Sequence, residues 1–282
     1  MDLAHLQALL AAIDEGSFDA AAVALHVTPS AVSQRIKALE TNAGSVLVRR
    51  SKPTAVTEAG RPYLRLARQV DALVAEAQNV ATTDVTLAIS ADALASWVLP
   101  ALASLPPGIT VDVRREDQDH SADLLRDGTV MAAITTDSAP VQGCTSERLG
   151  VMRYRPMAST AFADRWLPEG GTVAELAVAP VVVFDRKDDL QHAYLRRRSS
   201  RRLDPPRHYI PGSIEFAQAV RSGMGWAMLP DQQSSGWRDE MVEFDSERHT
   251  DVTLYWQQWS LRTPALEAVA GAVREAASVA LT

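Results

Sequence analysis

The stretch GSFDAAAVALHVTPSAVSQRIKALE, residues 16–40, predicts two short helices joined by a tight turn. Ser17 is placed to cap the first helix, and Thr28 followed by Pro29 is a typical start for the second. The second helix has one apolar face, and small polar and basic side chains surround the rest of it. Because reading base edges in the major groove of DNA requires such a helix, the stretch predicts a helix-turn-helix.

The sequence on both sides completes a small DNA-binding module. Apolar residues recur at helical spacing over 3–13 and predict a helix in front of the motif. Residues 44–57 predict two short strands around a basic turn, which together would form a wing. A long helix from Glu58 to about Asn79 carries an imperfect apolar stripe, so it can link domains and pair with its twin.

Within this module we expect base contacts from the second helix of the motif and phosphate contacts from Arg35 and the wing. Serine hydroxyls can bond any base edge, and glutamine can bond adenine. The candidate DNA-binding residues are Thr28, Pro29, Ser30, Ser33, Gln34, Arg35, Lys37, Arg49, Arg50 and Lys52. The alternative is a solvated helix face on which Arg35 pairs with Glu40 or Glu15.

The net charge of −7 argues at first against a nucleic-acid binder. Residues 1–82, however, hold eight basic and eight acidic residues, so this part is neutral and the rest is acidic. Six of the eight basic residues lie between 35 and 61, where only Glu40 and Glu58 oppose them. A local positive face is therefore compatible with the acidic total.

Composition indicates a cytoplasmic protein of two or three domains. The chain has 282 residues, and no stretch approaches the roughly 20 apolar residues of a membrane span. The first residues lack the features of a signal peptide. Cys144 is the single cysteine, which excludes an internal disulfide and a thiolate zinc cluster. We expect no metal, no cofactor and no membrane partner.

Beyond residue 83 the pattern changes to short β-rich runs that alternate with helices such as 94–105 and 213–222. The strand candidates are 85–89, 109–113, 130–135, 180–184, 207–210 and 226–229. Trp256 and Trp259 are interpreted as strand core. Alternating strands and helices predict parallel α/β sheets, which bind ligands at the carboxyl ends of their strands.

Four motifs together resemble the LysR-type transcriptional regulators: GSFxxAA at 16–22, TPSAVSQRIKxLE at 28–40, LxRR at 47–50 and TxxG at 57–60. The resemblance covers essentially the first 65 residues. It implies an all-α winged helix-turn-helix domain and a dimerising linker helix, followed by an α/β domain of two lobes like a periplasmic binding protein. The effector is expected between the lobes.

The expected domain limits are 1–60 for the DNA-binding domain, 61–82 for the linker helix and 83–282 for the effector domain. Lobe I is expected at about 83–160 and 255–282, and lobe II at about 161–254. The resemblance further implies a double-stranded DNA operator as partner and a homodimer that assembles into a homotetramer. RNA polymerase is a further candidate partner.

Three segments of the C-terminal part, 90–102, 184–189 and 254–256, are similar to the lysine- and arginine-sensing branch of these regulators. Members of that branch control export or metabolism of basic amino acids. The chain departs from the branch at Ser90, where asparagine is expected, and in the basic cluster 196–202. Lysine or arginine is thus the expected effector.

A basic amino acid needs hydrogen-bond donors for its carboxylate and acidic side chains for its two cationic groups. Candidates follow several of the predicted strands. The candidate effector-binding residues are Ser90, Asp92, Glu116, Thr135, Thr136, Asp185, Asp188 and Asp189. Each acid is equally explained as a helix cap or a solvated surface charge.

Three other functions are compared with this one. A LysR-type regulator of an aromatic or other small carboxylate would leave the acids as surface caps. An α/β enzyme would need a catalytic motif, and the chain has no GxSxG, Walker or HExxH sequence. A solute-binding receptor would need an export signal. We therefore expect a regulator and not an enzyme.

Overall fold

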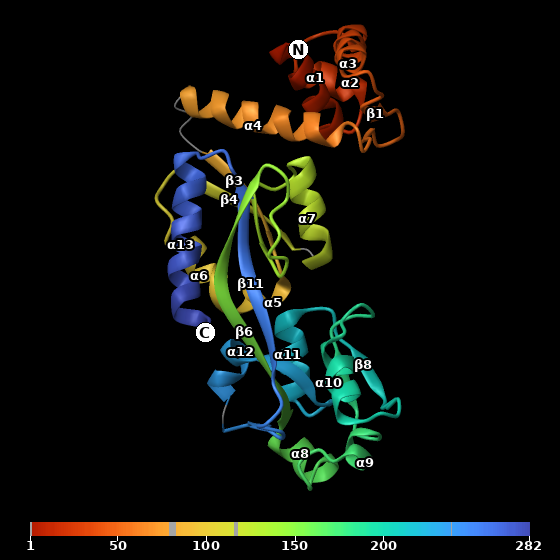
Figure 1. The fold of residues 1–282 in the computed structure, drawn as a ribbon, viewed down its shortest axis with the longest axis vertical. Coiled ribbons are helices and arrows are strands. Elements are labelled where there is room, and N and C mark those ends of the chain that lie inside the picture. Colours follow the sequence, from red (N-terminus) through yellow and green to blue (C-terminus); the bar gives the residue numbers. More distant parts are fainter. Residues whose placement is uncertain (1, 79–82, 116–117, 238) are drawn as a thin grey trace.

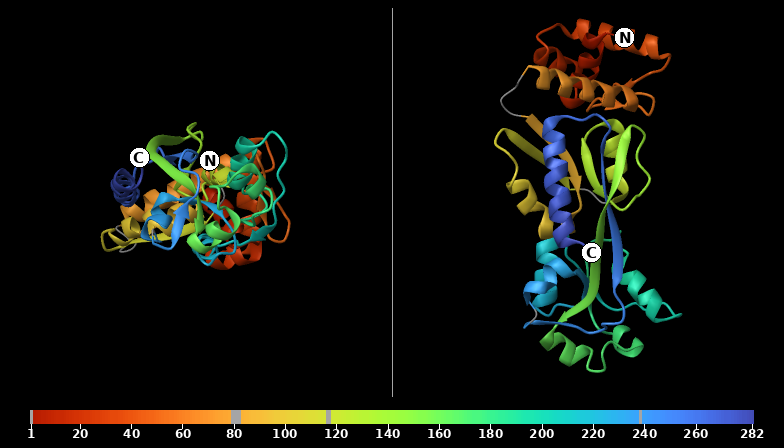
Figure 2. Two further views of the ribbon diagram at one scale, coloured as in Figure 1. Left: turned by 90° about the horizontal axis from the view of Figure 1, so that it is seen from below. Right: turned by 60° about the vertical axis from the view of Figure 1, so that its left-hand side comes forward.

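The computed structural model describes residues 2–78, 83–115, 118–237 and 239–282. Three parts follow one another along the longest axis of the molecule (Figure 1). A helical N-terminal part lies at one end, a long helix crosses beside it, and two α/β lobes extend away from that helix (Figures 1 and 2). No helix among these residues is long and apolar enough to cross a membrane.

The N-terminal part contains helices α1 (Leu3–Asp14), α2 (Phe18–Ala24) and α3 (Pro29–Ala43). Each begins where a side chain accepts a hydrogen bond from a backbone N–H of its first turn, and these side chains belong to Asp2, Ser17 and Thr28. Their apolar faces meet in one core around Leu9 and Ile36, which are fully buried. The predicted helix-turn-helix is therefore present.

Two short strands and a long helix complete this part. Strands β1 (Val48–Arg49) and β2 (Ala55–Val56) pair antiparallel and form the predicted wing. Helix α4 (Arg61–Ala77) begins three residues later than the predicted Glu58. Thr57 nevertheless leads into the helix, because it accepts the Gly60 N–H through its hydroxyl at 3.1 Å and the Arg61 N–H through its carbonyl oxygen at 3.1 Å. Gly60 packs beneath the wing, where a Cβ would lie 2.2 Å from the Leu47 carbonyl oxygen.

Helix α4 is docked on the α/β part through arginines. Arg68 Nη1 donates to the Asp127 carbonyl oxygen at 3.2 Å and to Thr129 Oγ1 at 3.0 Å. Arg65 donates to the Gln142 carbonyl oxygen. Gly128 lies so close that a Cβ there would be 2.9 Å from the Arg65 Cα. Helix α4 is thus held by the α/β part of the same chain.

The lobe nearer α4, lobe I, has a sheet in the order β4-β3-β5-β11-β6. The first three strands are parallel to one another, whereas β11 and β6 run antiparallel. The strands are β3 (Thr83–Ile89), β4 (Ile109–Arg115), β5 (Ala132–Thr135), β6 (Cys144–Ser159) and β11 (Thr250–Trp259). The helices are α5 (Ala91–Ala93), a π-helical turn (Leu94–Val98), α6 (Leu99–Ala103), α7 (Gln118–Asp127) and α13 (Pro264–Ala280).

Lobe II is built on the far ends of β6 and β11, which run through both lobes (Figure 1). Here β6 pairs with β9 and β10, and β7 pairs in parallel with β8. The remaining strands are β7 (Val181–Val183), β8 (Arg207–Tyr209), β9 (Ala227–Pro230) and β10 (Met241–Glu243). The helices are α8 (Thr160–Trp166), α9 (Val173–Leu176), α10 (Leu190–Arg198), α11 (Ser213–Arg221) and α12 (Asp231–Ser234).

The prediction of parallel sheets was wrong in part. Strands β6, β9, β10 and β11 pair antiparallel, so the main sheet is mixed. The predicted strands at 109–113, 180–184 and 226–229 correspond to β4, β7 and β9, and Trp256 and Trp259 lie in the core at 2% exposure each. The order of strands and helices along the chain does not reveal that the long strands β6 and β11 run through both lobes.

Candidate DNA-binding surface and ligand cleft

Helix α3 and the wing carry the candidate DNA-binding residues, and most of them are exposed to solvent. Ser33 and Arg35 are half-buried. The exposed members are Thr28, Pro29, Ser30, Gln34, Lys37, Arg49, Arg50 and Lys52. The buried face of the same helix carries Val32, Ile36 and Leu39. The helix is thus fixed by its apolar face and offers its polar face to a ligand.

Arg50 joins the wing to the helix-turn-helix. Its Nη2 donates to Ser33 Oγ at 3.2 Å, and its guanidinium carbon lies 5.1 Å from the centre of the Phe18 ring. Glu40 accepts the backbone N–H of Leu47 at 2.8 Å and so ties the end of α3 to the wing. No ion pair joins Arg35 to Glu40 or Glu15 within the described ranges.

Asp92 joins the two lobes. It follows β3 in lobe I, where Ser90 caps α5 by accepting the Ala93 N–H at 3.4 Å. The Asp92 carboxylate accepts from the Tyr154 hydroxyl at 2.9 Å and from the Ser213 hydroxyl at 2.6 Å. Because Ser213 begins α11 of lobe II, the Asp92 carboxylate lies at the boundary between the lobes.

Asp188 approaches the same place from lobe II. Its carboxylate accepts backbone N–H groups of Leu190 at 3.0 Å and Phe184 at 3.2 Å. Burial raises the pKa of Asp188, the two N–H groups lower it, and the charges of Asp92 and Asp185 raise it further. The two carboxylates from opposite lobes are therefore within electrostatic reach of one another.

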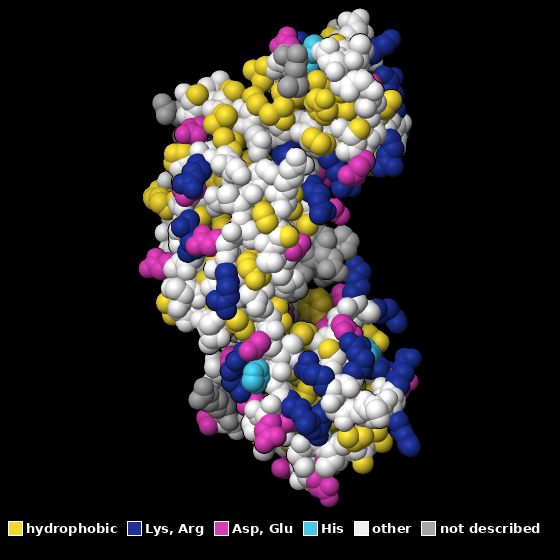
Figure 3. Space-filling view, viewed as in Figure 1, with side chains coloured by type: hydrophobic (Ala, Val, Ile, Leu, Met, Phe, Trp, Pro, Cys, Tyr) yellow, Lys and Arg dark blue, Asp and Glu magenta, His cyan; other side chains and the backbone are white. Residues whose placement is uncertain are grey.

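The buried Tyr154 lies beside Asp92 and within electrostatic reach of Asp188. Burial raises its pKa well above the ordinary value, and Asp92 and Asp188 add to the rise. Among the residues that the structure describes, no arginine or lysine forms an ion pair with Asp92, Asp185 or Asp188. The boundary between the lobes therefore carries negative charge that these residues do not neutralise. The surface is hollowed between the lobes on the side where α10 lies (Figure 3).

The other candidate effector residues have different surroundings. Asp185 accepts the N–H groups of Lys187 at 2.7 Å and Asp188 at 3.0 Å, so it shapes the loop before α10. Asp189 forms an ion pair with Arg196 at 2.5 Å on the surface, and both side chains are 63% exposed. The hydrogen bond from Arg196 lowers the pKa of Asp189.

The threonines at the end of β5 lie in lobe I. Thr135 is 3% exposed and its Oγ1 accepts the Asp137 N–H at 3.1 Å, whereas Thr136 is half-buried. Glu116 lies outside the described residues. In the described part of the chain, no group of three or more His, Cys, Asp or Glu is placed to hold a metal ion.

Tyr154, Ser213 and Gln233 were not predicted from the sequence to belong to this site. Gln233 Nε2 donates to Ser213 Oγ at 2.7 Å and extends the network of Asp92 into α12. Ser213 had a local signal, since it opens a predicted helix after Gly212. Tyr154 had none, because the strand that carries it was not predicted.

Comparisons with known proteins agree with this architecture. A family model described as bacterial regulatory helix-turn-helix protein, lysR family, matches residues 3–61. A second model, described as LysR substrate binding domain, matches residues 78–278. Together the two models account for almost the whole chain.

Full-length relatives are also similar. The HTH-type transcriptional regulator LysG of Mycobacterium tuberculosis is 44% identical, covering 99% of this chain and 94% of the relative. The lysine export transcriptional regulatory protein LysG of Corynebacterium glutamicum is 37% identical, with 98% of each chain covered. A solved structure of full-length LysG from Corynebacterium glutamicum with bound effector Arg has a TM-score of 0.87 at 37% identity, covering 100% of this chain and 99% of that one.

Proposed function

Because the chain belongs to the LysR family of bacterial transcriptional regulators, which bind DNA and a small-molecule effector, we propose that it senses lysine or arginine. We propose further that it controls genes such as an amino-acid exporter. Two similarities support this assignment: one relative is named a lysine export regulator, and a similar solved structure holds Arg. LysR-family regulators are not enzymes, so the sequence-based expectation of a regulator is confirmed.

The pair of acids at the boundary between the lobes is the main support for this proposal. Asp92 and Asp188 come from opposite lobes, and burial raises the pKa of Asp188. A guanidinium or ammonium group placed between them would neutralise both lobes at once and so favour their closure. Charge-assisted hydrogen bonds of this kind contribute about 1.5–3 kcal/mol each.

The described candidate residues take different parts in this proposal. Asp92 and Asp188 contact the distal cation. Asp185 keeps Asp188 in place, because its carboxylate accepts the backbone N–H of Asp188. Ser90 and the threonines at 135 and 136 supply donors for the α-carboxylate. Asp189 already has a cation partner in Arg196, so we assign it no direct contact.

An aromatic or other carboxylate effector without a cation fits these surroundings less well. Asp92 and Asp188 would repel a third negative charge, and within the described ranges no arginine or lysine pairs with them to offset it. A basic amino acid supplies the missing charge.

The DNA partner is proposed to be a double-stranded operator that α3 and the wing contact, with dimers formed through α4 and joined into tetramers. The 43% exposure of Leu73 on α4 supports an apolar partner for that helix. The limits 1–60, 61–82 and 83–282, the cytoplasmic location and the contact with RNA polymerase remain part of the proposal.

Thermal unfolding of the full chain with lysine or arginine tests the effector assignment. At about 100 times its dissociation constant the effector should stabilise the native protein by about 2.7 kcal/mol. Asp188→Asn and Asp92→Asn should abolish most of this stabilisation. Asp189→Asn is the matched control, because it makes the same chemical change on the exposed partner of Arg196. Equal loss in all three variants, or stabilisation by none of the ligands, would contradict the proposal.

A further inference from the structure

The arginine-rich segment at the end of α10 borders a cavity that the proposed function does not use. Residues 196–202 consist of five arginines and two serines. The cavity has a volume of about 600 Å³, and His192, three arginines, two serines and two leucines line it. Neither Asp92 nor Asp188 borders it, so it is distinct from the cleft between the lobes.

Two of the five arginines have structural roles. Arg197 Nη2 donates to Thr250 Oγ1 at 2.6 Å. Arg198 donates to the Gly171 carbonyl oxygen at 2.5 Å and forms an ion pair with Asp245 at 3.4 Å. These two guanidinium groups tie α10 to its neighbours and are not available to a ligand.

The cations that face the cavity differ in their partners. Arg196 donates two hydrogen bonds to the exposed Asp189 carboxylate, at 2.9 and 2.5 Å, so an anion bound at Arg196 would take the place of that carboxylate. Within the described part of the chain, the Arg202 guanidinium has no hydrogen bond or ion pair of its own. Its acidic neighbour Asp204 is bound to Arg207, which lowers the Asp204 pKa most, and the nearby charges of Arg202 and His192 lower that pKa further.

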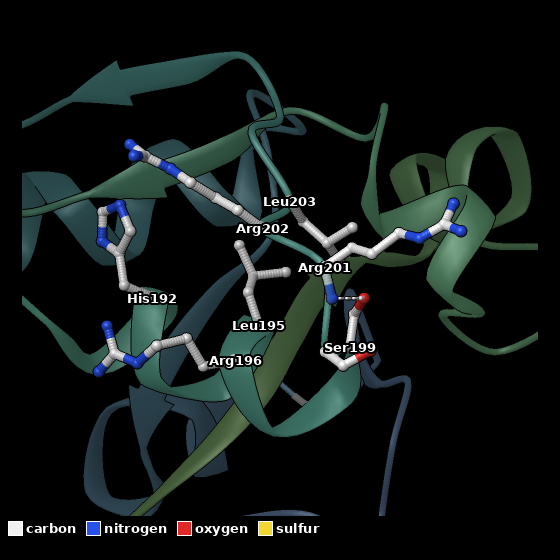
Figure 4. A pocket seen from close by; sticks show the side chains of 8 residues that line it. His192, Leu195, Arg196, Ser199, Arg201, Arg202 and Leu203 are labelled. Atoms are coloured by element: carbon white, nitrogen blue, oxygen red, sulfur yellow. Dashed lines mark hydrogen bonds between the residues drawn. The ribbon is translucent and has the colours of Figure 1, made fainter.

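The arrangement of the lining is asymmetric (Figure 4). The charged ends of Arg196 and Arg202 gather with the His192 ring on one side, and Leu195 and Leu203 lie between them and Arg201. The guanidinium of Arg201 points to the opposite side. No acidic side chain is among the described residues that line the cavity. The cavity therefore has basic side chains on one side, next to the apolar side chains of Leu195 and Leu203.

From this geometry we infer that the cavity binds a small organic molecule that carries a phosphate group. The phosphate lies at His192, Arg196 and Arg202, and the apolar part lies over the two leucines. Two guanidinium forks and an imidazole offer more N–H donors than the two oxygens of one carboxylate take up, whereas a phosphate has three acceptor oxygens and nearly two charges. The volume falls within the range of small-molecule sites, about 300–1,000 Å³, and exceeds the needs of a bare ion.

DNA phosphate is a less suitable occupant. The cavity lies on lobe II, whereas α3 and the wing lie at the opposite end of the molecule (Figure 1). Within one chain the two surfaces cannot face the same duplex segment. A ligand at α10 would instead affect the position of Asp188 in lobe II, because α10 begins two residues after Asp188.

Calorimetric titration of the full chain with n-butyl phosphate at low ionic strength tests the inference. We expect saturable binding of one molecule per chain. Arg202→Gln should weaken binding about tenfold or more, because a charge-assisted contact is lost. Arg201→Gln should change it less than about twofold, although it removes the same charge from the adjacent position. Both side chains are exposed, so neither change disturbs the fold.

The alternatives give distinguishable outcomes. Equal weakening by both variants would mean a diffuse electrostatic effect and would overturn the site. Absence of saturable binding would overturn it as well. Butyrate, which has a carboxylate on a similar tail, should bind at least tenfold more weakly than butyl phosphate, and equal affinity would refute the assignment to phosphate.

Discussion

Asp188 is held where its own negative charge is disfavoured. Burial raises the pKa of this carboxyl, the Leu190 and Phe184 N–H groups offset part of the rise, and Asp92 and Asp185 add to it. The contribution of Asp188 to the stability of the free protein therefore falls as pH rises from the ordinary pKa of aspartate to the raised pKa. Above the raised pKa this contribution no longer changes with pH. A bound cation lowers the pKa of Asp188, because it favours the ionised carboxylate.

This difference predicts a pH dependence of effector binding. Above the raised pKa Asp188 is ionised and affinity should not change with pH. Below it, binding requires loss of a proton, so affinity should fall by up to about tenfold per pH unit. Calorimetry with arginine from neutral to mildly acidic pH measures this fall. Asp188→Asn should flatten the profile, and an unchanged profile in that variant would contradict the role given to Asp188.

Only some residues of the cleft could be predicted from the sequence. Asp92 and Asp188 were predicted because each follows a strand and precedes a helix. Adjacent Asp189 has the same local signal, yet it pairs with Arg196 seven residues away on the surface. Tyr154 and Ser213 lie 62 and 121 residues from Asp92 in the chain. Such partnerships are decided by tertiary packing, which a local pattern does not contain.

At the scale of elements, α3 and the wing should contribute differently to DNA binding. Gln34 is exposed on α3, so Gln34→Ala should weaken specific binding and relax the preference at one base pair. Arg50→Ala should weaken binding to all sequences alike and reduce the slope of log affinity against log salt by about 0.9. Fluorescence anisotropy over a salt series, with footprinting, measures both effects.

Arg165→Ala is a suitable control, since it removes an exposed charge on α8 of lobe II. If Gln34→Ala and Arg50→Ala matched the wild type in affinity and footprint, the predicted DNA surface would be wrong.

Elements with local signals were predictable, and those without them were not. Ser17 and Thr28 cap α2 and α3 as predicted, because a cap bonds to a backbone N–H within three residues. Strand β6 was missed because charged residues interrupt its apolar side chains. In the structure Arg153 pairs with Asp251 at 2.8 Å and Arg155 pairs with Asp231 at 2.6 Å. These charges are accommodated by neighbouring elements that lie far away in the sequence.

At the scale of the whole molecule, lobe I connects the cleft to the DNA-binding part. It meets lobe II where Asp92 accepts from Ser213, and it holds α4 through Arg65 and Arg68. Helix α4 in turn reaches α1 through the ion pair of Arg68 with Asp14 at 2.8 Å. A change in how the lobes meet can therefore reach the DNA-binding helices through direct contacts.

If the cation of a basic amino acid binds between the lobes, the wild-type chain should distinguish L-arginine from L-citrulline, which has nearly the same shape but no charge on its side chain. Calorimetric titration with the two ligands measures this difference. We expect saturable binding of arginine and at least tenfold weaker binding of citrulline, because one charge-assisted contact is worth about that factor or more. Equal affinity for the two ligands, or no binding of arginine, would rule out this mode of effector binding.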